Sequence, residues 1–227
     1  MHWDCCAYFR DLRLDRLRKY GVRVVGEVDP DSEPVTMEDA RAHLRVDTFG
    51  SPPESDDDFW IRNIGLPGAR EWAELYSGRS IGLRSMELAM NRFPAGSVMT
   101  LPFGPVDSVA SIVYDDTDGV EQIMDPADYV LDYYGPLPTI RLAPGASWPT
   151  DARDEFDAIR VSYLAGYTPA GASPPGLRIP ASIRAAILLM LGHLYENRET
   201  ASAVSVEEIP LGARPLLDLT RIRLGMA

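Results

Sequence analysis

The three histidines are the first residues to consider for chemistry in this 227-residue chain. They are His2, His43 and His193, and they lie far apart, whereas a zinc site usually takes several His, Cys or carboxylate ligands at fixed spacing. Glu196 lies three residues after His193, which would place both on one helix face, as di-metal sites of helical bundles require. Such sites need a second pair and two further glutamates, so a packed or hydrogen-bonding histidine is the favoured interpretation.

The arrangements needed for covalent or phosphate chemistry are also missing. One Gly-x-Ser-x-Gly pentad, residues 78–82, follows the predicted helix 59–76 and precedes the predicted strand 85–92, whereas a nucleophile elbow leads from a strand into a helix. The only lysine, Lys19, does not follow a glycine-rich turn. Cys5 and Cys6 are adjacent and rarely reach disulfide geometry with each other, and no Cys-x-x-Cys spacing exists for zinc. The sequence therefore predicts a protein that is not an enzyme, with no cofactor and no metal, in a reducing compartment.

Carboxylates are numerous, but their local groups do not indicate catalysis. Residues 115–118 lack the alternating spacing and the twelfth-position glutamate of a calcium loop, and Gly119 after them is typical of a hairpin turn. The pairs at 154–155 and 207–208 are interpreted as solvated surface, because glycosidase chemistry needs two carboxylates placed across a cleft.

Composition restricts the partners of this chain. It is 45% hydrophobic and 25% charged, which permits a sizeable core. Its formal net charge of −12 repels free nucleic acid unless a local basic patch overrides the mean. No apolar run approaches the roughly 18 residues of a membrane span, and no apolar segment of a secretory signal begins the chain. We expect a soluble protein that does not bind membranes.

Helices are predicted on both sides of a β-rich middle. Thr36 can cap a helix over residues 36–46, with Asp39 three residues on as in a capping box. The carboxylates of residues 56–58 suit the start of a second helix, and we interpret them as a charged terminus in solvent.

That second helix is predicted over residues 59–76. Pro67 lacks a backbone donor, so the interruption Gly65-Leu66-Pro67-Gly68 predicts a kink or a split. Gly78 is placed to end the helix. A third, largely buried helix begins at Pro180, because apolar residues recur after it at steps of three and four.

The middle of the chain has short β-branched and aromatic runs separated by Gly and Pro. Such runs at this spacing predict a small antiparallel barrel or sandwich. A short strand is also predicted over residues 22–25. The predicted strands of the middle are 85–92, 97–101, 106–114, 120–124, 129–133, 139–142 and 158–163.

The order of helices, strands and helices predicts an α+β fold, with a helical bundle formed by N- and C-terminal helices and an inserted β domain. The expected parts are an N-terminal extension, a helical connector core in two segments, the inserted β domain, and a C-terminal arm with a short helix. Their bounds are 1–33, then 34–79 with 178–200, then 80–168, and 201–227.

Short motifs follow one another along residues 34–224 in a characteristic order. They open with Pro34-Val35-Thr36 and close with Ile209-Pro210-Leu211-Gly212. The motifs between them occupy residues 43–47, 69–70, 76–79, 101–102, 105–106, 108–109, 125–129, 148–149, 165–167, 179–180, 183–188 and 193–199. In this order and spacing the chain resembles the head–tail connector (adaptor) proteins of tailed bacteriophages and gene transfer agents.

The resemblance implies a structural protein of the virion. Connectors of this family form a ring, commonly of twelve subunits, that docks under the portal protein, extends the DNA channel and contacts the stopper or tail-completion protein. DNA would pass without sequence-specific binding, along a channel wall that we expect to be negative. The implied location is the neck between capsid and tail, after assembly in the host cytoplasm. Residues 1–30 and the break at residues 65–68 depart from the family pattern.

Apolar residues of the C-terminal arm are the candidate interface. They follow a polar stretch, and segments that become ordered on binding are common at junctions of this kind. We expect the arm to bind the portal or a neighbouring subunit, and the alternative is a helix that closes the subunit's own bundle. The candidate residues are Leu211, Leu216, Leu217, Leu219, Ile222 and Leu224.

Three other functions stay open at this stage. One is another neck structural protein of a phage, such as a stopper or tail-completion protein, although those are usually smaller and richer in strands. Another is a hydrolase-type enzyme built on the β domain, which the scattered histidines disfavour. The last is an adaptor unrelated to viruses, which would form discrete oligomers without a portal.

Overall fold

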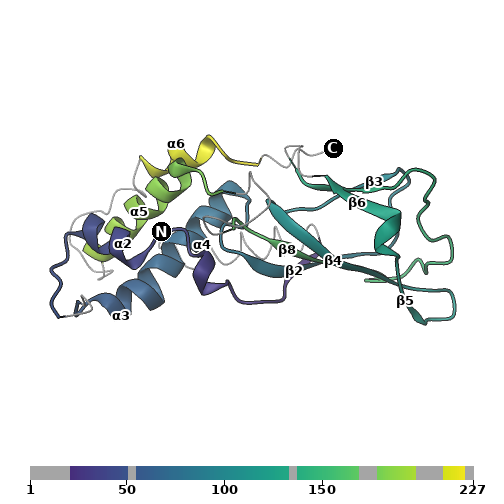
Figure 1. The fold of residues 1–227 in the computed structure, drawn as a ribbon, viewed down its shortest axis with the longest axis horizontal. Helices are drawn as coiled ribbons and strands as arrows, with labels where there is room; N and C mark the ends of the chain where they lie inside the picture. The colour runs from purple at the N-terminus through teal and green to yellow at the C-terminus, as the bar shows by residue number, and fades with distance from the viewer. Residues whose placement is uncertain (1–20, 51–54, 133–136, 169–177, 198–211, 223–227) are drawn as a thin grey trace, which may run out of the picture. The chain divides into compact units, whose positions relative to one another are not determined.

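The chain divides into two compact units, each of which is described by itself (Figure 1). We call the part within residues 21–32 and 82–178 the β unit, and the part within residues 33–81 and 179–222 the helical unit. The predicted α+β class is confirmed, because antiparallel sheets build one unit and helices the other. The computed structural model describes residues 21–50, 55–132, 137–168, 178–197 and 212–222.

The larger sheet of the β unit has five antiparallel strands in the order β1-β2-β8-β4-β5. The central strand alternates strictly, since Ile159, Val161, Tyr163 and Ala165 are buried and the residues between them are less so. A period of two is expected of a strand with one face on the core. The strands are β1 (Val22–Val24), β2 (Arg84–Met90), β8 (Ile159–Ala165), β4 (Val106–Asp115) and β5 (Glu121–Ile123).

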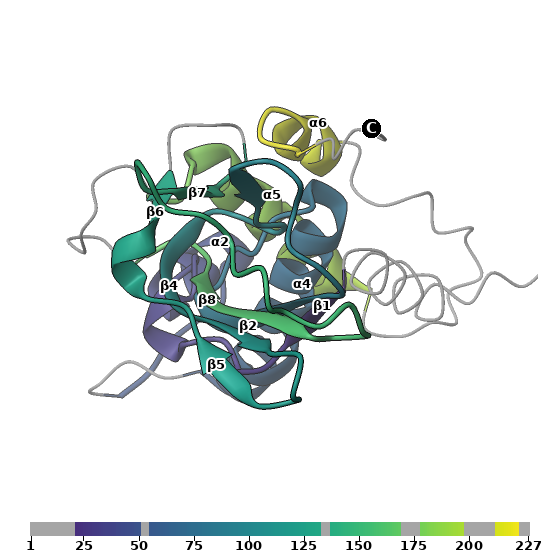
Figure 2. The ribbon, with the colours of Figure 1, turned by 90° about the vertical axis from the view of Figure 1, so that its right-hand side faces the viewer.

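The smaller sheet packs against the larger one and shares its core. Figures 1 and 2 show β6 on one side of the layer that contains β2, β4 and β8. Buried residues of both sheets form one cluster, for example Ile112 and Val161 with Met99 and Ile140. Its strands, in the order β3-β7-β6, are β3 (Val98–Thr100), β7 (Thr139–Leu142) and β6 (Tyr129–Asp132).

Of the two predicted β architectures, the sandwich is confirmed and the closed barrel is wrong. Among the described residues, β1 and β5 form the two edges of the larger sheet and do not pair with the smaller sheet. Every strand predicted in the middle of the chain overlaps an observed one, although residue 133 lies outside the described residues. The predicted hairpin turn is confirmed between β4 and β5, where Gly119 has a φ of +78°.

The helical unit contains a first group of helices before the β unit and a second group after it. Thr36 caps α2 as predicted, with its side chain accepting a hydrogen bond from the Asp39 N–H at 3.1 Å. The Asp39 carboxylate pairs with Arg184 at 2.6 Å instead of completing a capping box. The helices are α2 (Met37–Leu44), α3 (Asp58–Trp60), the π-helical segment η2 (Ile61–Gly65), α4 (Leu66–Ser77), α5 (Ala181–Glu196) and α6 (Ala213–Asp218).

A π-helical turn lies directly before Pro67, where the sequence predicts a kink or a split. The Leu66 N–H donates to the Ile61 carbonyl five residues back, and the backbone stays right-handed helical on both sides of the turn. Pro67 then lies in the first turn of α4, directly after the π-helical segment. The wider turn before it relieves the clash that a proline ring makes with a preceding carbonyl. Gly78, with a φ of +70°, ends α4 as predicted.

A substitution at Gly65 tests how the π-helical segment packs against Trp60 and α5, because there is no space for a side chain at this residue. A Cβ would lie 2.6 Å from Trp60 Cζ3 and 2.7 Å from Leu191 Cδ1. We predict that Gly65→Ala lowers the free energy of unfolding by about 1–3 kcal/mol, as overpacking does. Urea denaturation measures this change.

Gly68→Ala is the matched control in the same helical stretch. Its Cβ would meet Leu194 Cδ1 at 3.7 Å, an ordinary contact. We expect this variant to gain up to about 1 kcal/mol from helix propensity. Equal effects of the two variants would contradict the packing described for the π turn.

Candidate assembly surfaces

The described residues contain no group of three or more His, Cys, Asp and Glu that could hold a metal ion. His193 on α5 makes a local contact, with its Nδ1 3.4 Å from the Asn197 side-chain nitrogen. His43 on α2 packs close to α5, where Gly192 leaves room for its ring. The described contacts of His193 are therefore with Asn197 of its own helical unit, and His43 lies near Gly192 of α5. In the described part of the chain, no helix has the length and apolar character needed to cross a membrane.

A buried ion cluster organises the first half of the helical unit. Arg70 of α4 lies between two carboxylates, with Nε 3.1 Å from Glu33 Oε2 and Nη1 3.6 Å from Glu74 Oε2. Glu74 also accepts a hydrogen bond from the Ile81 N–H at 2.8 Å. Burial raises the pKa of Glu33, Arg70 opposes this shift, and Glu74 adds to it. The cluster has a structural role, since all of its groups are paired within the unit.

The carboxylates at the start of α3 are not the solvated terminus that the sequence predicts. Arg41 of α2 holds Asp58 with two hydrogen bonds, one of them from Nε to Oδ1 at 2.9 Å. These bonds are the main cause of a lowered pKa of Asp58. Asp57 accepts a hydrogen bond from the Tyr195 hydroxyl of α5. The interpretation is therefore wrong for these two residues, because each finds a partner from a distant part of the sequence.

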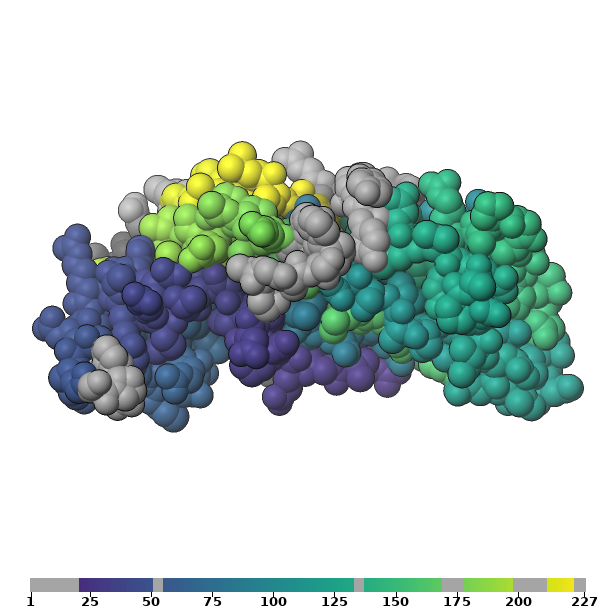
Figure 3. Space-filling view, viewed as in Figure 1, coloured from purple at the N-terminus to yellow at the C-terminus, as the bar shows by residue number. Residues whose placement is uncertain are grey.

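The C-terminal candidate residues have unequal exposure. Leu217 is fully buried where α6 packs on α4 and α5. Figure 3 shows α6, in yellow, lying against α5, in light green. Leu216 and Ile222 are half-buried. Leu219 is 76% exposed and is the one described member of the set that presents a large apolar side chain to solvent. Leu211 and Leu224 lie outside the described residues.

Polar contacts fix α6 and the residues after it to the helical unit. The Ile222 N–H donates to the Ser77 carbonyl at 3.0 Å, and the Tyr76 hydroxyl donates to Asp218 at 3.1 Å. The Arg221 guanidinium lies over the Tyr76 ring, 4.7 Å from its centroid. The described part of the predicted arm therefore packs on the helical unit of its own chain. Its role as an interface stays a prediction.

Other large apolar side chains of the helical unit remain exposed. Phe59 is 74% exposed on α3, and Ile64 is 53% exposed in the π-helical segment that follows. Phe49, in the loop before α3, is 59% exposed. Exposed apolar surface of this kind marks contact sites when it gathers in patches. The sequence predicts no interface role for Phe59 or Ile64, because helical spacing does not show what covers a residue.

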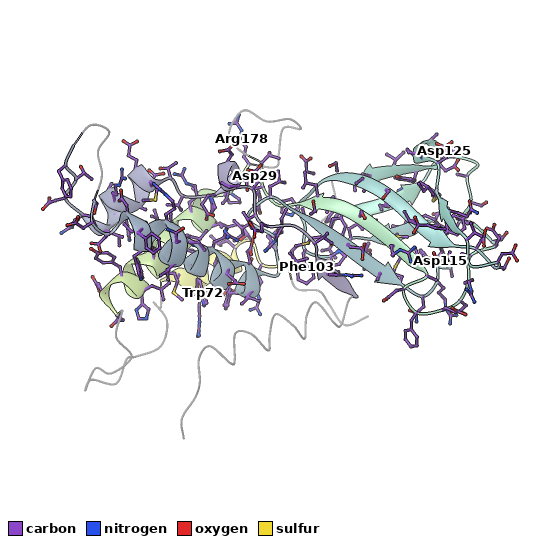
Figure 4. All side chains as sticks on the ribbon, turned by 90° about the horizontal axis from the view of Figure 1, so that it is seen from below. Asp29, Trp72, Phe103, Asp115, Asp125 and Arg178 are labelled. Carbon is purple, nitrogen blue, oxygen red and sulfur yellow. The ribbon has the colours of Figure 1, made fainter. Side chains whose placement is uncertain are left out.

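The acidic end of the β unit is the second candidate surface. Residues 115–157 contain eleven carboxylates and two arginines, and Figure 4 shows Asp115 and Asp125 at the same end of the unit. Arg160 of β8 binds Asp115 and Glu121, each at 2.9 Å, and its hydrogen bond is the main cause of a lowered pKa of Asp115. Three exposed apolar residues lie among these charges: Val120, Ile123 and Phe156, the last 90% exposed.

An open depression lies beside this end, entirely within the β unit. Its lining includes Tyr114, Ile123 and Trp148, and its ionisable side chains are three aspartates and that tyrosine. Trp148 stacks on Phe93 at a centroid distance of 5.1 Å and donates to the Gly96 carbonyl at 2.7 Å. Hydroxyls of Ser147 and Thr150 also line the depression, whereas no histidine, cysteine or lysine does.

No protein-family model and no curated protein matches the chain. Its fold is similar to chains of gene transfer agent particles. A chain in the neck of an empty particle, computed with C6 symmetry, is 25% identical with a TM-score of 0.68, and a chain in the virion of the native particle is 25% identical with a TM-score of 0.67. A chain in the neck of the native particle, computed with C12 symmetry, shares the fold at 23% identity and a TM-score of 0.63. Each comparison covers 91% of this chain and 98% of the other.

Leu217 and Leu219 form a matched pair for testing how α6 packs. We predict that Leu217→Ala lowers the free energy of unfolding by about 2–5 kcal/mol, because it leaves a cavity between α6 and the helices beneath it. Leu219→Ala changes this free energy by less than about 0.5 kcal/mol, because the side chain is largely in solvent. Urea denaturation of both variants measures the difference, and equal costs would show that α6 does not pack as described.

Glu33 predicts a specific dependence of stability on pH. The pKa of folded Glu33 is raised above the ordinary value of 4.5, so its contribution to stability is fully present below pH 4.5 and is lost as the pH rises through the folded pKa. We expect the stability of the wild type relative to Glu33→Gln to fall as the pH rises from 4.5 toward neutral. Chemical denaturation at several pH values measures the free energy of unfolding of both proteins. If the advantage of the wild type over Glu33→Gln grew as the pH rises, the raised pKa of Glu33 would be refuted.

Asp58→Asn is the control with the opposite sign. Because Arg41 lowers the pKa of Asp58, the wild type should hold an advantage over this variant above pH 3.8, which is lost as the pH falls through the folded pKa.

Proposed function

We propose that this chain is a structural protein of the virion neck, and within the neck a head–tail connector (adaptor) subunit that assembles as a ring under the portal protein. The observation that carries the proposal is the similarity to a gene transfer agent neck chain over 91% of this chain and 98% of that one. A single shared domain would be weak support, because one fold hosts many functions. Here the likeness covers both units.

The order of motifs along residues 34–224 supports the proposal separately. It points to connectors on the sequence alone, without reference to any fold. The subunit would extend the DNA channel, and its net charge of −12 would let DNA slide past without sequence-specific binding.

A ring requires two different surfaces on every subunit, because each subunit meets its two neighbours head to tail. The neck of the similar particle was computed with C6 symmetry, which is compatible with six or twelve copies. We infer twelve from the resemblance to connectors. Exposed Phe59 and Ile64 on the helical unit are candidates for one contact, and Leu219 remains a candidate for the portal or a neighbouring subunit.

The direct test mixes the purified full-length chain with purified portal protein and images the product by negative-stain electron microscopy. We predict a defined ring of this chain on one face of the portal. If the chain instead forms rings only with the stopper or tail-completion protein, another neck role replaces the connector role. Discrete oligomers that ignore the portal would favour an adaptor unrelated to viruses.

Leu219→Glu asks whether the exposed leucine contributes to assembly. It should reduce portal occupancy at least tenfold while the denaturation midpoint of the free chain stays unchanged, because this side chain has little packing to lose. The control is Val130→Glu, an equally polar change at a 58% exposed residue of β6. Equal occupancy of the two variants would remove Leu219 from the interface.

A further inference from the structure

The acidic end of the β unit carries an exposed apolar surface that the proposed ring contacts do not use. We call Val120, Ile123 and Phe156 the distal surface; their exposed fractions are 54%, 69% and 90%. The two segments that supply them lie side by side. Arg160 joins the segments, because its guanidinium binds the Glu121 carboxylate at 2.9 Å and the Asp157 carbonyl at 3.0 Å.

The chemistry of the distal surface defines what can bind there. Carboxylates surround its apolar residues, and those of Asp118, Glu121, Glu155 and Asp157 belong to exposed residues next to them in the sequence. An occupant must bring apolar side chains and several positive charges together. Arginine suits this purpose best, since its planar group binds carboxylates through two hydrogen bonds and is weakly hydrated.

One stretch of this chain has that composition, and it lies outside the described residues. Residues 10–20 contain four arginines, the only lysine and three leucines, with two aspartates. The remainder of the chain is strongly acidic: residues 21–227 have a net charge of −14, whereas residues 1–20 have +2. Charge complementarity therefore favours this stretch over every other part of the chain.

The sheet places the start of that stretch within reach of the distal surface. The Gly21 carbonyl accepts a hydrogen bond from the Ala89 N–H at 2.8 Å. Ala89 pairs with Arg160, Arg160 with Val113, and Val113 with Ile123, so one row of residues crosses the whole sheet. Four strand spacings of about 4.8 Å make this row about 19 Å long.

A chain of ten residues covers about 15 Å as a helix and about 33 Å when extended. Residues 10–20 can therefore reach Ile123 from Gly21 without leaving their own subunit. We propose that residues 10–20 bind the distal surface of their own β unit, with leucines on Ile123 and Phe156 and guanidinium groups among the carboxylates. The proposal does not depend on the role of the chain in a ring.

A single lysine placed in the middle of the stretch permits a direct test. Lys19 is the only lysine in the chain, but it lies two residues from Gly21, so the double variant Arg13→Lys, Lys19→Arg moves the amine eight residues away from Gly21 at unchanged charge. Treatment of this full-length protein with a carbodiimide joins the amine to a carboxylate in contact with it, and mass spectrometry identifies the residue. We expect cross-links from residue 13 to Asp118, Glu121 or Glu155. An equal mixture of ¹⁵N-labelled and unlabelled protein should give no mixed-isotope products. Links to carboxylates of the helical unit, links only between copies, or none from residue 13 would each overturn the proposal.

Three controls make the result specific. Lys19→Arg alone keeps the charge, leaves the chain without a lysine and should abolish the link, which separates the lysine side chain from the terminal amine. Ile123→Ser and Phe156→Ser alter exposed residues and should each lower the yield at least threefold, whereas Val130→Ser on the smaller sheet should leave it unchanged. Raising salt to 0.5 M, where screening is strong, should also lower the yield. If the cross-link yield were unchanged in the distal-surface variants and at high salt, the proposed binding of residues 10–20 would be refuted.

Discussion

The buried pairing of Arg70 with Glu33 and Glu74 holds together the points where the chain enters and leaves the helical unit. The chain enters this unit at Glu33 and leaves it at Ile81. The α4 helix holds both points, since Arg70 pairs with Glu33 and Glu74 accepts the Ile81 N–H. Loss of one partner of a buried ion pair typically costs about 3–5 kcal/mol, because the remaining charge stays desolvated. The same cluster thus joins α4 to the two ends of the segment that contains it.

Separate hydrogen bonds hold together the points where the chain leaves and re-enters the β unit. The Asp29 N–H donates to the Leu83 carbonyl at 2.8 Å, and the Leu83 N–H donates to the Ser32 side chain at 2.8 Å. Each unit therefore has its own contacts that hold the two chain segments running between the units, near residues 29–33 and 81–83. This explains how residues 82–178 can be inserted within a helical sequence while both units keep complete cores.

Local features were predictable from the sequence, and distant pairings were not. Alternation and turn residues located the strands, since both signals lie within a few residues of one another. The partners of Asp58, Asp39 and Glu33 are 17, 145 and 37 residues away, so no local pattern identifies them. Leu217 and Leu219 look alike in the sequence, and only the packing of α6 separates the buried one from the exposed one. The π turn was predicted only as an interruption, because Pro67 excludes a regular helix without selecting its replacement.

Cryo-electron microscopy of particles assembled with this chain is the most direct test of its place in the neck. We predict density between capsid and tail, repeated around the particle axis, into which the β unit and the helical unit each fit. Particles that contain the chain elsewhere, or that have a complete neck when it is absent, would contradict the claim.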